Sequence, residues 1–279
     1  MTFTPTPTPA PDDEDAHHIE ASKAPLLAHL IELRGHVLFS LIVFVVMFGL
    51  CFYLAPQIFN ILLYPYERAS EAGDSLQLIY TAPQEFLLTQ IRLALFGALF
   101  LSFPVMAVRL YMFVAPGLYR QERRAFLPFL AATPVLFLLG SLLVYFVIMP
   151  LALAFFLDME QAGGPQEAAI TLMPRVSEYL SLAMTLIFAF GLCFQLPVLL
   201  TLLARVGLLQ ADSLRRQRKY AVVGVFALAA VLTPPDIISQ IGLGVPTLLL
   251  YELSIFCVAA VERKQAAQRM ADNTGELAS

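Results

Sequence analysis

Charge is scarce in this sequence. Only 14% of its 279 residues are Asp, Glu, Lys or Arg, whereas 59% are hydrophobic and the mean hydropathy is +0.75. Soluble domains are about 25% charged, so a soluble fold could not hide this much apolar surface from water. The scarcity excludes a soluble globular protein and predicts that lipid surrounds most of the chain. The apolar runs are nearly continuous, which favours one membrane bundle over several domains.

Three further absences bound the chemistry. The three cysteines lie singly within apolar runs, so neither a disulfide framework nor a metal site is expected, and no cofactor is predicted. No lysine belongs to a Gly-Lys-Ser/Thr loop, which excludes an ATPase of that type. All four histidines precede the first apolar run and no run contains a lysine, which excludes an intramembrane serine protease with such a base. We therefore predict that the chain is not an enzyme.

One group of residues has a spacing that is compatible with metal binding. His29, Glu32 and His36 fall on one helical face by their spacing. Such spacing is common by chance and no further ligand suggests itself, so an ordinary helix start at the membrane interface is the favoured interpretation.

Charge-free runs predict the membrane spans, because a helix needs about 20 apolar residues to cross a hydrocarbon layer of about 30 Å. The predicted spans are residues 37–54, 86–108, 125–150, 179–204, 220–235 and 237–251. The last two are short and are split by "TPPD". Residues 55–84 are long enough for a short helix lying over the membrane face, and residues 151–175 are expected to form an irregular cap. An even number of spans places both termini on one side.

The basic residues predict which side that is. With both termini inside, all of the 17 Lys and Arg residues except Arg68, Arg92 and Arg175 lie in the inner segments. Basic residues are retained in the cytoplasm, so the distribution predicts an N-in, C-in protein.

The two ends of the chain differ from its middle. The segment "TPTPTPAPDDED" lacks the basic start and apolar middle of a signal peptide. Its alternating prolines, followed by acids, are typical of a disordered and extended segment. We predict a disordered cytoplasmic tail over residues 1–24, a six-span membrane domain over residues 25–262 and a cytoplasmic C-terminal tail over residues 263–279.

Taken singly, each polar motif near the spans has an ordinary explanation. The helix dipole favours Glu32 near a helix start, the arginines of "FVAPGLYRQERR" (residues 113–124) obey the orientation rule, and Asp236 is placed to cap the next helix. Gln195 is interpreted as a link between helices that bonds a carbonyl freed by Pro197. A secondary transporter of a small solute is the alternative function. Such proteins usually carry charges near the midplane and repeated halves, and neither is evident here.

Taken together, the motifs resemble one family. "HLIELR" before the first span, "FVAPGLYRQERR" after the second, "FGLCFQLPV" in the fourth and "LTPPD" between the last two resemble TatC, the core membrane subunit of the twin-arginine protein translocase. The resemblance covers about residues 25–262 and implies an all-α, polytopic protein of the bacterial inner membrane, with six transmembrane helices in a cupped bundle. It also implies export of folded proteins with TatA-type and TatB-type single-span subunits, driven by the proton-motive force, and self-association in a receptor complex. Nucleic acid is not an expected partner.

The resemblance further implies a site for signal peptides. TatC proteins recognise peptides with two consecutive arginines at the cytoplasmic face, and the positions that match the family's recognition acids are Glu32 and Glu122. A guanidinium is planar, always charged and able to bind a carboxylate through two parallel hydrogen bonds, whereas lysine is a point charge. The residues expected to shape the pocket are Phe113, Pro116, Leu118 and Tyr119, and the arginines expected to hold the acids in place are Arg34, Arg123 and Arg124.

Three polar positions in or beside the later spans also match the family. Many members carry Glu where this chain has Gln195, so a titratable acid is missing at that depth, although an amide still offers hydrogen bonds to a polar group on a TatA-type helix. Asp236 and Gln240 match other family positions. These three residues form the predicted polar site for partner subunits.

Overall fold

Helices make up nearly all of the chain that the computed structural model describes, which is residues 11–69, 78–114, 123–157, 173–232 and 237–276. The all-α prediction is confirmed. The elements in chain order are α1 (Pro11–Tyr53), α2 (Ala55–Ala69), α3 (Glu85–Val114), α4 (Arg123–Leu143), η3 (Val144–Ile148), α5 (Met149–Leu157), α6 (Val176–Cys193), α7 (Leu196–Arg205), α8 (Ala211–Arg216), α9 (Arg218–Leu232) and α10 (Ile237–Glu276). The element η3 is a π-helical turn between α4 and α5.

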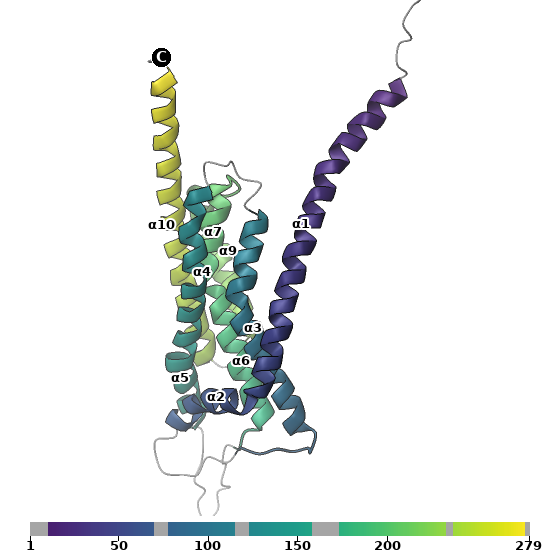
Figure 1. Cartoon of the computed structure of the whole chain (residues 1–279). Coiled ribbons are helices and arrows are strands. Elements are labelled where there is room, and N and C mark those ends of the chain that lie inside the picture. The colour runs from purple at the N-terminus through teal and green to yellow at the C-terminus, as the bar shows by residue number, and fades with distance from the viewer. Residues whose placement is uncertain (1–10, 70–77, 115–122, 158–172, 233–236, 277–279) are drawn as a thin grey trace, which may run out of the picture.

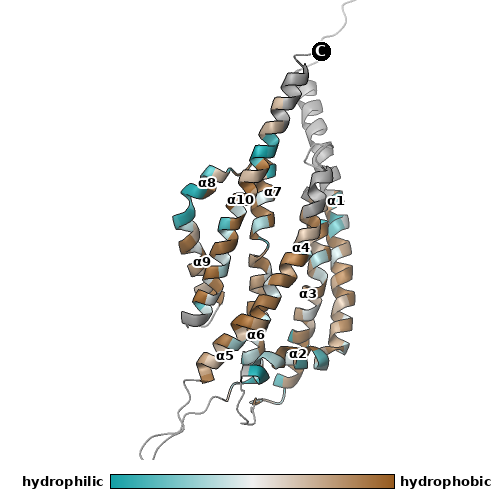
Figure 2. Cartoon of the chain, turned by 90° about the vertical axis from the view of Figure 1, so that its left-hand side faces the viewer, coloured by the Kyte–Doolittle hydropathy of each residue, from teal (hydrophilic) through white to brown (hydrophobic). Residues whose placement is uncertain are grey.

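The long helices run along a common axis, and α2 lies across one end of them (Figure 1). The first turns of α1 and the last turns of α10 lie at the opposite end (Figure 1). We call the end covered by α2 the cap face, and the end where α1 begins and α10 finishes the terminal face. Hydrophobic residues follow the middles of the helices, whereas α8, toward the terminal face, is largely hydrophilic (Figure 2). This banding suits a bundle whose middle lies in a bilayer.

Five described helices are long and apolar enough to cross a membrane. These are Ile31–Tyr53, Glu85–Phe113, Phe129–Leu157, Val176–Arg205 and Ser239–Ala267. The remaining apolar helix, α9, has only 15 residues and corresponds to the short fifth run of the sequence. The structure therefore contains the predicted spans, with the fifth span the short one.

The helices extend beyond several predicted boundaries. Residues 11–24, for which the composition favours a disordered tail, form the first turns of α1. Acidic residues at 12–15 begin this helix, where the helix dipole favours negative charge. The expected irregular cap is helical as far as Leu157, and α10 continues through residues 263–276. Residues 1–10 lie outside the described residues.

The α6–α7 span is the centre of the bundle and α1 is its periphery. In their most apolar stretches, 61% of the residues of α6–α7 are buried but only 11% of those of α1. Helix α1 packs chiefly against α3, and Ile42, Val45 and Val46 on its open side are exposed. These side chains face the lipid. Because the packed side of α1 contacts chiefly α3, α3 is the main element that positions α1.

Helices α4 and α6 approach each other closely at two glycines. A Cβ added at Gly140 would lie 2.7 Å from the carbonyl oxygen of Phe190, and one at Gly191 would lie 2.5 Å from the ring of Phe137. That ring is fully buried and stacks on Phe103 with the ring centroids 4.1 Å apart. Only glycine leaves room for these contacts, which explains the glycine of the "FGLCFQLPV" segment.

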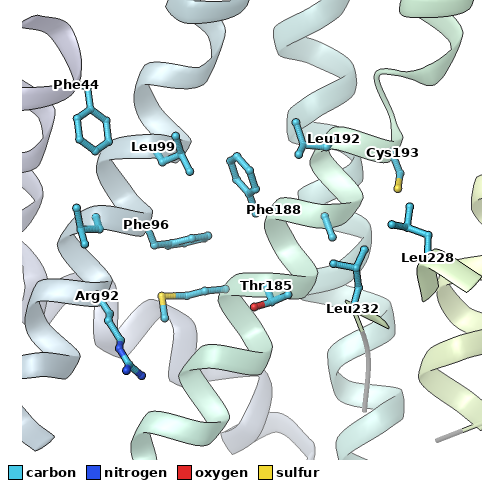
Figure 3. A pocket seen from close by; sticks show the side chains of 13 residues that line it. Phe44, Arg92, Phe96, Leu99, Thr185, Phe188, Leu192, Cys193, Leu228 and Leu232 are labelled. Atoms are coloured by element: carbon cyan, nitrogen blue, oxygen red, sulfur yellow. The ribbon is translucent and has the colours of Figure 1, made fainter. Parts of the chain in front are cut away.

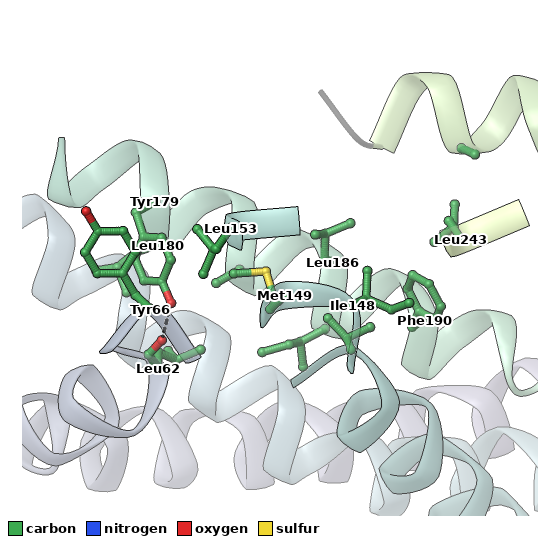
Figure 4. Packing of buried hydrophobic residues seen from close by; sticks show 14 of the residues in the cluster. Leu62, Tyr66, Ile148, Met149, Leu153, Tyr179, Leu180, Leu186, Phe190 and Leu243 are labelled. Carbon is green, nitrogen blue, oxygen red and sulfur yellow. Dashed lines mark hydrogen bonds between the residues drawn. The ribbon is translucent and has the colours of Figure 1, made fainter. Parts of the chain in front are cut away.

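Two tyrosines fasten α2 to the cap face. Pro65 has no N–H to donate to the carbonyl of Ile61, and the hydroxyl of Tyr145 donates to that carbonyl instead, at 2.7 Å. The hydroxyl of Tyr179 donates to the carbonyl of Leu62 at 2.7 Å within the main apolar cluster (Figure 4). The predicted short helix over the membrane face is therefore present and anchored.

One carboxylate joins the starts of α3 and α6 at the cap face. Glu85 accepts hydrogen bonds from the Thr81 backbone N–H at 2.8 Å and from the Ser177 hydroxyl at 2.5 Å. Beside it, the backbone N–H of Ile79 donates to Pro174, and that of Val176 donates back to Ile79. These bonds fix the register between the two spans.

Candidate functional site

Two residues of the predicted signal-peptide site lie near each other where α3 ends beside α1, on the side of the terminal face (Figure 1). Glu32 of α1 has a half-exposed side chain, and its Oε1 lies 3.9 Å from Nε2 of His36. The His36 ring packs edge-to-face on Phe113 of α3, with the ring centroids 6.4 Å apart. His36 therefore bridges the acid and the aromatic ring.

His36 is a site residue that the sequence reasoning considered only as a metal ligand. Its side chain is 16% exposed, and its Nδ1 is buried with no hydrogen-bond partner among the described residues. A Glu and a His four residues apart face each other on a helix, so the spacing did contain the signal. What it could not show was Phe113 on the other side of the ring.

A second contact holds the same two helices together deeper in the bundle. The guanidinium carbon of Arg109 on α3 lies 3.9 Å from the ring centroid of Phe39 on α1. Exposed cation–π contacts contribute about 0.5–1 kcal/mol. Since α1 has few other neighbours, this contact helps to position Glu32.

The remaining predicted site residues are described only in part. The described residues do not include Pro116, Leu118, Tyr119 and Glu122, and nothing is described of the side chains of Arg123 and Arg124 at the start of α4. Arg34 is exposed, and the ion pair that Glu32 makes within the described residues is with His36. The roles of these arginines and of Glu122 stay predictions.

Gln195 lies in the turn between α6 and α7. Its Nε2 donates to the backbone carbonyl of Thr133 on α4 at 2.9 Å. This is a bond between helices, as the sequence suggested, but the acceptor lies on α4 and is not a carbonyl freed by Pro197. The Oε1 is buried and has no hydrogen-bond partner in the described part of the chain. One acceptor on this amide is thus available to a further donor.

The predicted polar site does not form one hydrogen-bonded group among the described residues. The Nε2 of Gln240 makes a long hydrogen bond to the carbonyl of Phe226 at 3.5 Å, which joins α10 to α9, whereas Gln195 bonds α4. Asp236 lies outside the described residues. Among the described residues, no group of three His, Cys, Asp or Glu side chains lies close enough to hold a metal ion.

The family model described as "Sec-independent protein translocase protein (TatC)" matches residues 28–246 of this chain. The chain belongs to the TatC family. The matched region contains Glu32, Phe113, Gln195 and Gln240, and it spans the whole loop between α3 and α4.

Relatives of known name cover most of the chain. It is 44% identical over 250 residues to the TatC protein of Magnetococcus marinus, which covers 90% of this chain and 89% of that protein. It is 35% identical to the TatC protein of Escherichia coli K12, over 83% of this chain and 87% of that protein. A crystal structure of the twin arginine translocase receptor TatC superposes with a TM-score of 0.72 at 35% identity, covering 84% of this chain and 99% of that one.

Family membership settles several expectations. This TatC-family chain is a component of the Sec-independent, twin-arginine protein translocase and not a catalytic enzyme. It is a multi-pass protein of the inner membrane. The alternative of a small-solute transporter is not supported.

Proposed function

We propose that this TatC-family chain is the receptor that binds twin-arginine signal peptides at the cytoplasmic face of the inner membrane. With TatA-type and TatB-type single-span subunits it would then export folded cargo, driven by the proton-motive force. The bias of basic residues supports an N-in, C-in orientation, which makes the terminal face the cytoplasmic one.

The position of Glu32 carries this proposal. It is a half-exposed carboxylate on the side of the terminal face. It lies beside His36, whose ring packs on the ring of Phe113. The loop that follows Phe113 contains Glu122, the second acid of the family's motif. Two carboxylates at a membrane surface are suited to two guanidinium groups, each bound by a pair of parallel hydrogen bonds.

The strength of the contact depends on how far the peptide shields it from water. A fully exposed ion pair contributes only about 0–1 kcal/mol, whereas a hydrogen bond to a charged group contributes about 1.5–3 kcal/mol. Because a bound peptide would cover a half-exposed carboxylate beside Phe113, we expect the upper range. Glu32→Ala should therefore weaken peptide binding by roughly ten- to a hundredfold.

Selectivity distinguishes recognition from a structural role. We would measure the affinity of peptides with Arg-Arg and with Lys-Lys for the wild type and for Glu32→Gln and Glu122→Gln in lipid nanodiscs. The wild type should lose more affinity than either variant when arginines become lysines, because an amide loses the charge and one acceptor. The control is Asp212→Asn, an exposed acid in α8 that pairs with Arg215, which should leave the preference unchanged. Equal losses in wild type and variants would show that the acids only stabilise the fold.

The partner subunits are tested separately. The unpartnered Oε1 of Gln195 supports a role as acceptor for a polar group on a partner helix; for Asp236 and Gln240 the support is the family match. Co-purification from mild detergent should recover single-span subunits with the wild type and fewer with Gln195→Leu. Equal recovery would remove Gln195 from the partner site.

A further inference from the structure

An elongated groove opens between α3 and α6 in the half of the bundle nearer the cap face. We call it the α3–α6 groove. Its volume is about 680 Å³, within the range of small-molecule sites, and its lining includes Phe44, Leu99, Phe188, Leu228 and Arg92. Figure 3 shows the apolar side chains along its length and Arg92 at one end. The groove is thus apolar along most of its length, with one cationic side chain at one end, which we call the mouth.

The mouth is polar beyond Arg92. A second recess of about 510 Å³ shares Arg92 and Thr185 with the groove and adds Ser177, Glu178 and Ser181 from the start of α6. Since α6 begins at the cap face, the polar end of the combined space points toward that membrane surface. A ligand that fits both parts is an amphiphile with a polar head and an apolar chain.

Arg92 has an unusual position for a charge. It lies in α3 seven residues after Glu85, about 10 Å further along the helix, and its side chain is exposed to the groove. Charged groups at this depth are costly unless they are paired or reach the interface. An arginine can extend toward the headgroup region, which in this chain is the polar recess.

Glu178 lines the same recess as Arg92, but no ion pair of the described residues joins Arg92 to a carboxylate. The ion pair of Glu178 is with Arg175, at 3.7 Å, and Glu85 is occupied by Thr81 and Ser177. An anion from outside this part of the chain would therefore complete the site.

We propose that the α3–α6 groove binds an anionic phospholipid from the leaflet at the cap face. Its phosphate accepts hydrogen bonds from Arg92 and nearby hydroxyls, and one acyl chain lies along the apolar body. At the mouth, Arg175 offsets the charge of Glu178, so the guanidinium of Arg92 is left to select the headgroup, because a phosphate matches the guanidinium fork. The groove is open sideways to lipid, since Leu95, Leu192 and Leu228 on its edges are exposed. The alternative occupant is a carboxylate on a partner's transmembrane helix.

Lipid retention tests the site without any signal peptide. Detergent-purified wild type is mixed with equal amounts of phosphatidylglycerol and phosphatidylethanolamine, and bound lipid is counted by native mass spectrometry. We expect the wild type to prefer phosphatidylglycerol by about fivefold, the effect of one basic residue near an anionic lipid. Arg92→Gln should abolish the preference and Arg92→Lys should retain part of it. Arg68→Gln, at an exposed arginine in the last turn of α2 that lines neither recess, should leave it unchanged.

A thermal assay supplies a second readout. Added phosphatidylglycerol should raise the apparent melting temperature of the wild type but not of Arg92→Gln, because a ligand stabilises only the state that binds it. The proposal is wrong if the wild type and Arg92→Gln retain the two lipids in the same ratio, or if Arg68→Gln loses the preference to the same extent as Arg92→Gln. It is also wrong if Arg92→Gln keeps the lipid preference but loses a co-purifying single-span subunit, which would make a partner's carboxylate the occupant.

Discussion

Replacing Gly140 by alanine tests how closely α4 and α6 pack. The added Cβ would lie 2.7 Å from the carbonyl oxygen of Phe190 and 2.8 Å from the ring of Phe194, well inside the usual contact distance of about 3.5–4.0 Å. A backbone oxygen cannot rotate away, so the two helices must separate. Overpacking of this kind costs about 1–3 kcal/mol, and the greater helix propensity of alanine offsets only about 1 kcal/mol. We expect a net destabilisation of up to about 2 kcal/mol.

Gly224 in α9 supplies the matched control. A Cβ there would meet nothing within 4 Å, so Gly224→Ala should gain up to about 1 kcal/mol from helix propensity alone. The two variants then differ by up to about 3 kcal/mol, or roughly 6–12 °C in apparent melting temperature. The measurement is thermal unfolding in mild detergent, monitored as the loss of monodisperse protein with temperature. If Gly140→Ala melts at or above the temperature of Gly224→Ala, the close contact between α4 and α6 does not exist.

Three further outcomes follow from the fold. Glu85→Ala should lower the apparent melting temperature more than Glu178→Ala does, because Glu85 joins α3 to α6 whereas Glu178 pairs only with Arg175; equal effects would contradict the proposed link. After replacement of the three native cysteines, Gln84→Cys at the cap face should react with an impermeant reagent in sealed cells and Gln217→Cys at the terminal face should not. The reverse pattern would overturn the N-in orientation. Four leucines inserted into α9 should impair export while peptide binding persists, and unchanged export would show that the short length of this span has no role.

The sequence predicted the spans well because a helix that crosses lipid must be a long run of apolar residues. In the part of the chain that the structure describes, each predicted span is helical apart from short turns, and the short fifth run corresponds to the 15-residue α9. The boundaries were less predictable. Once a span is helical, nothing in water forces the helix to stop at the membrane surface, so α1 and α10 continue far beyond the apolar runs. The break at Gln195 was not predicted either, although Pro197 occupies the start of α7, as is usual for proline.

Contacts of the candidate site within one helix could be predicted from the spacing of residues, but contacts between helices could not. Glu32 and Phe113 could be named from the family's motifs, but a sequence motif does not say which side chain lies between two helices. The contacts of His36 with Phe113 and of Phe39 with Arg109 both join α1 to α3 across more than sixty residues of chain. The acceptor of Gln195 was misassigned for the same reason. The local argument pointed to the carbonyl that Pro197 frees, whereas packing brought Thr133 of α4 within 2.9 Å.

Helix α9 is shorter than the hydrocarbon layer of an ordinary bilayer is thick. The 15 residues of α9 span about 22 Å as a helix, short of the usual hydrocarbon thickness of about 30 Å. Helix α10 beside it is much longer, and its apolar stretch runs past the start of α9. Arg218 at the start of α9 lies 2.7 Å from Glu252 of α10, which places Glu252 level with the first turn of α9, and apolar residues of α10 continue beyond it to Val261. The short apolar length at the edge formed by α9 and α10 is therefore that of α9, and a bilayer that meets α9 must thin locally. A single-span partner helix with a short apolar segment would match this edge better than surrounding lipid does.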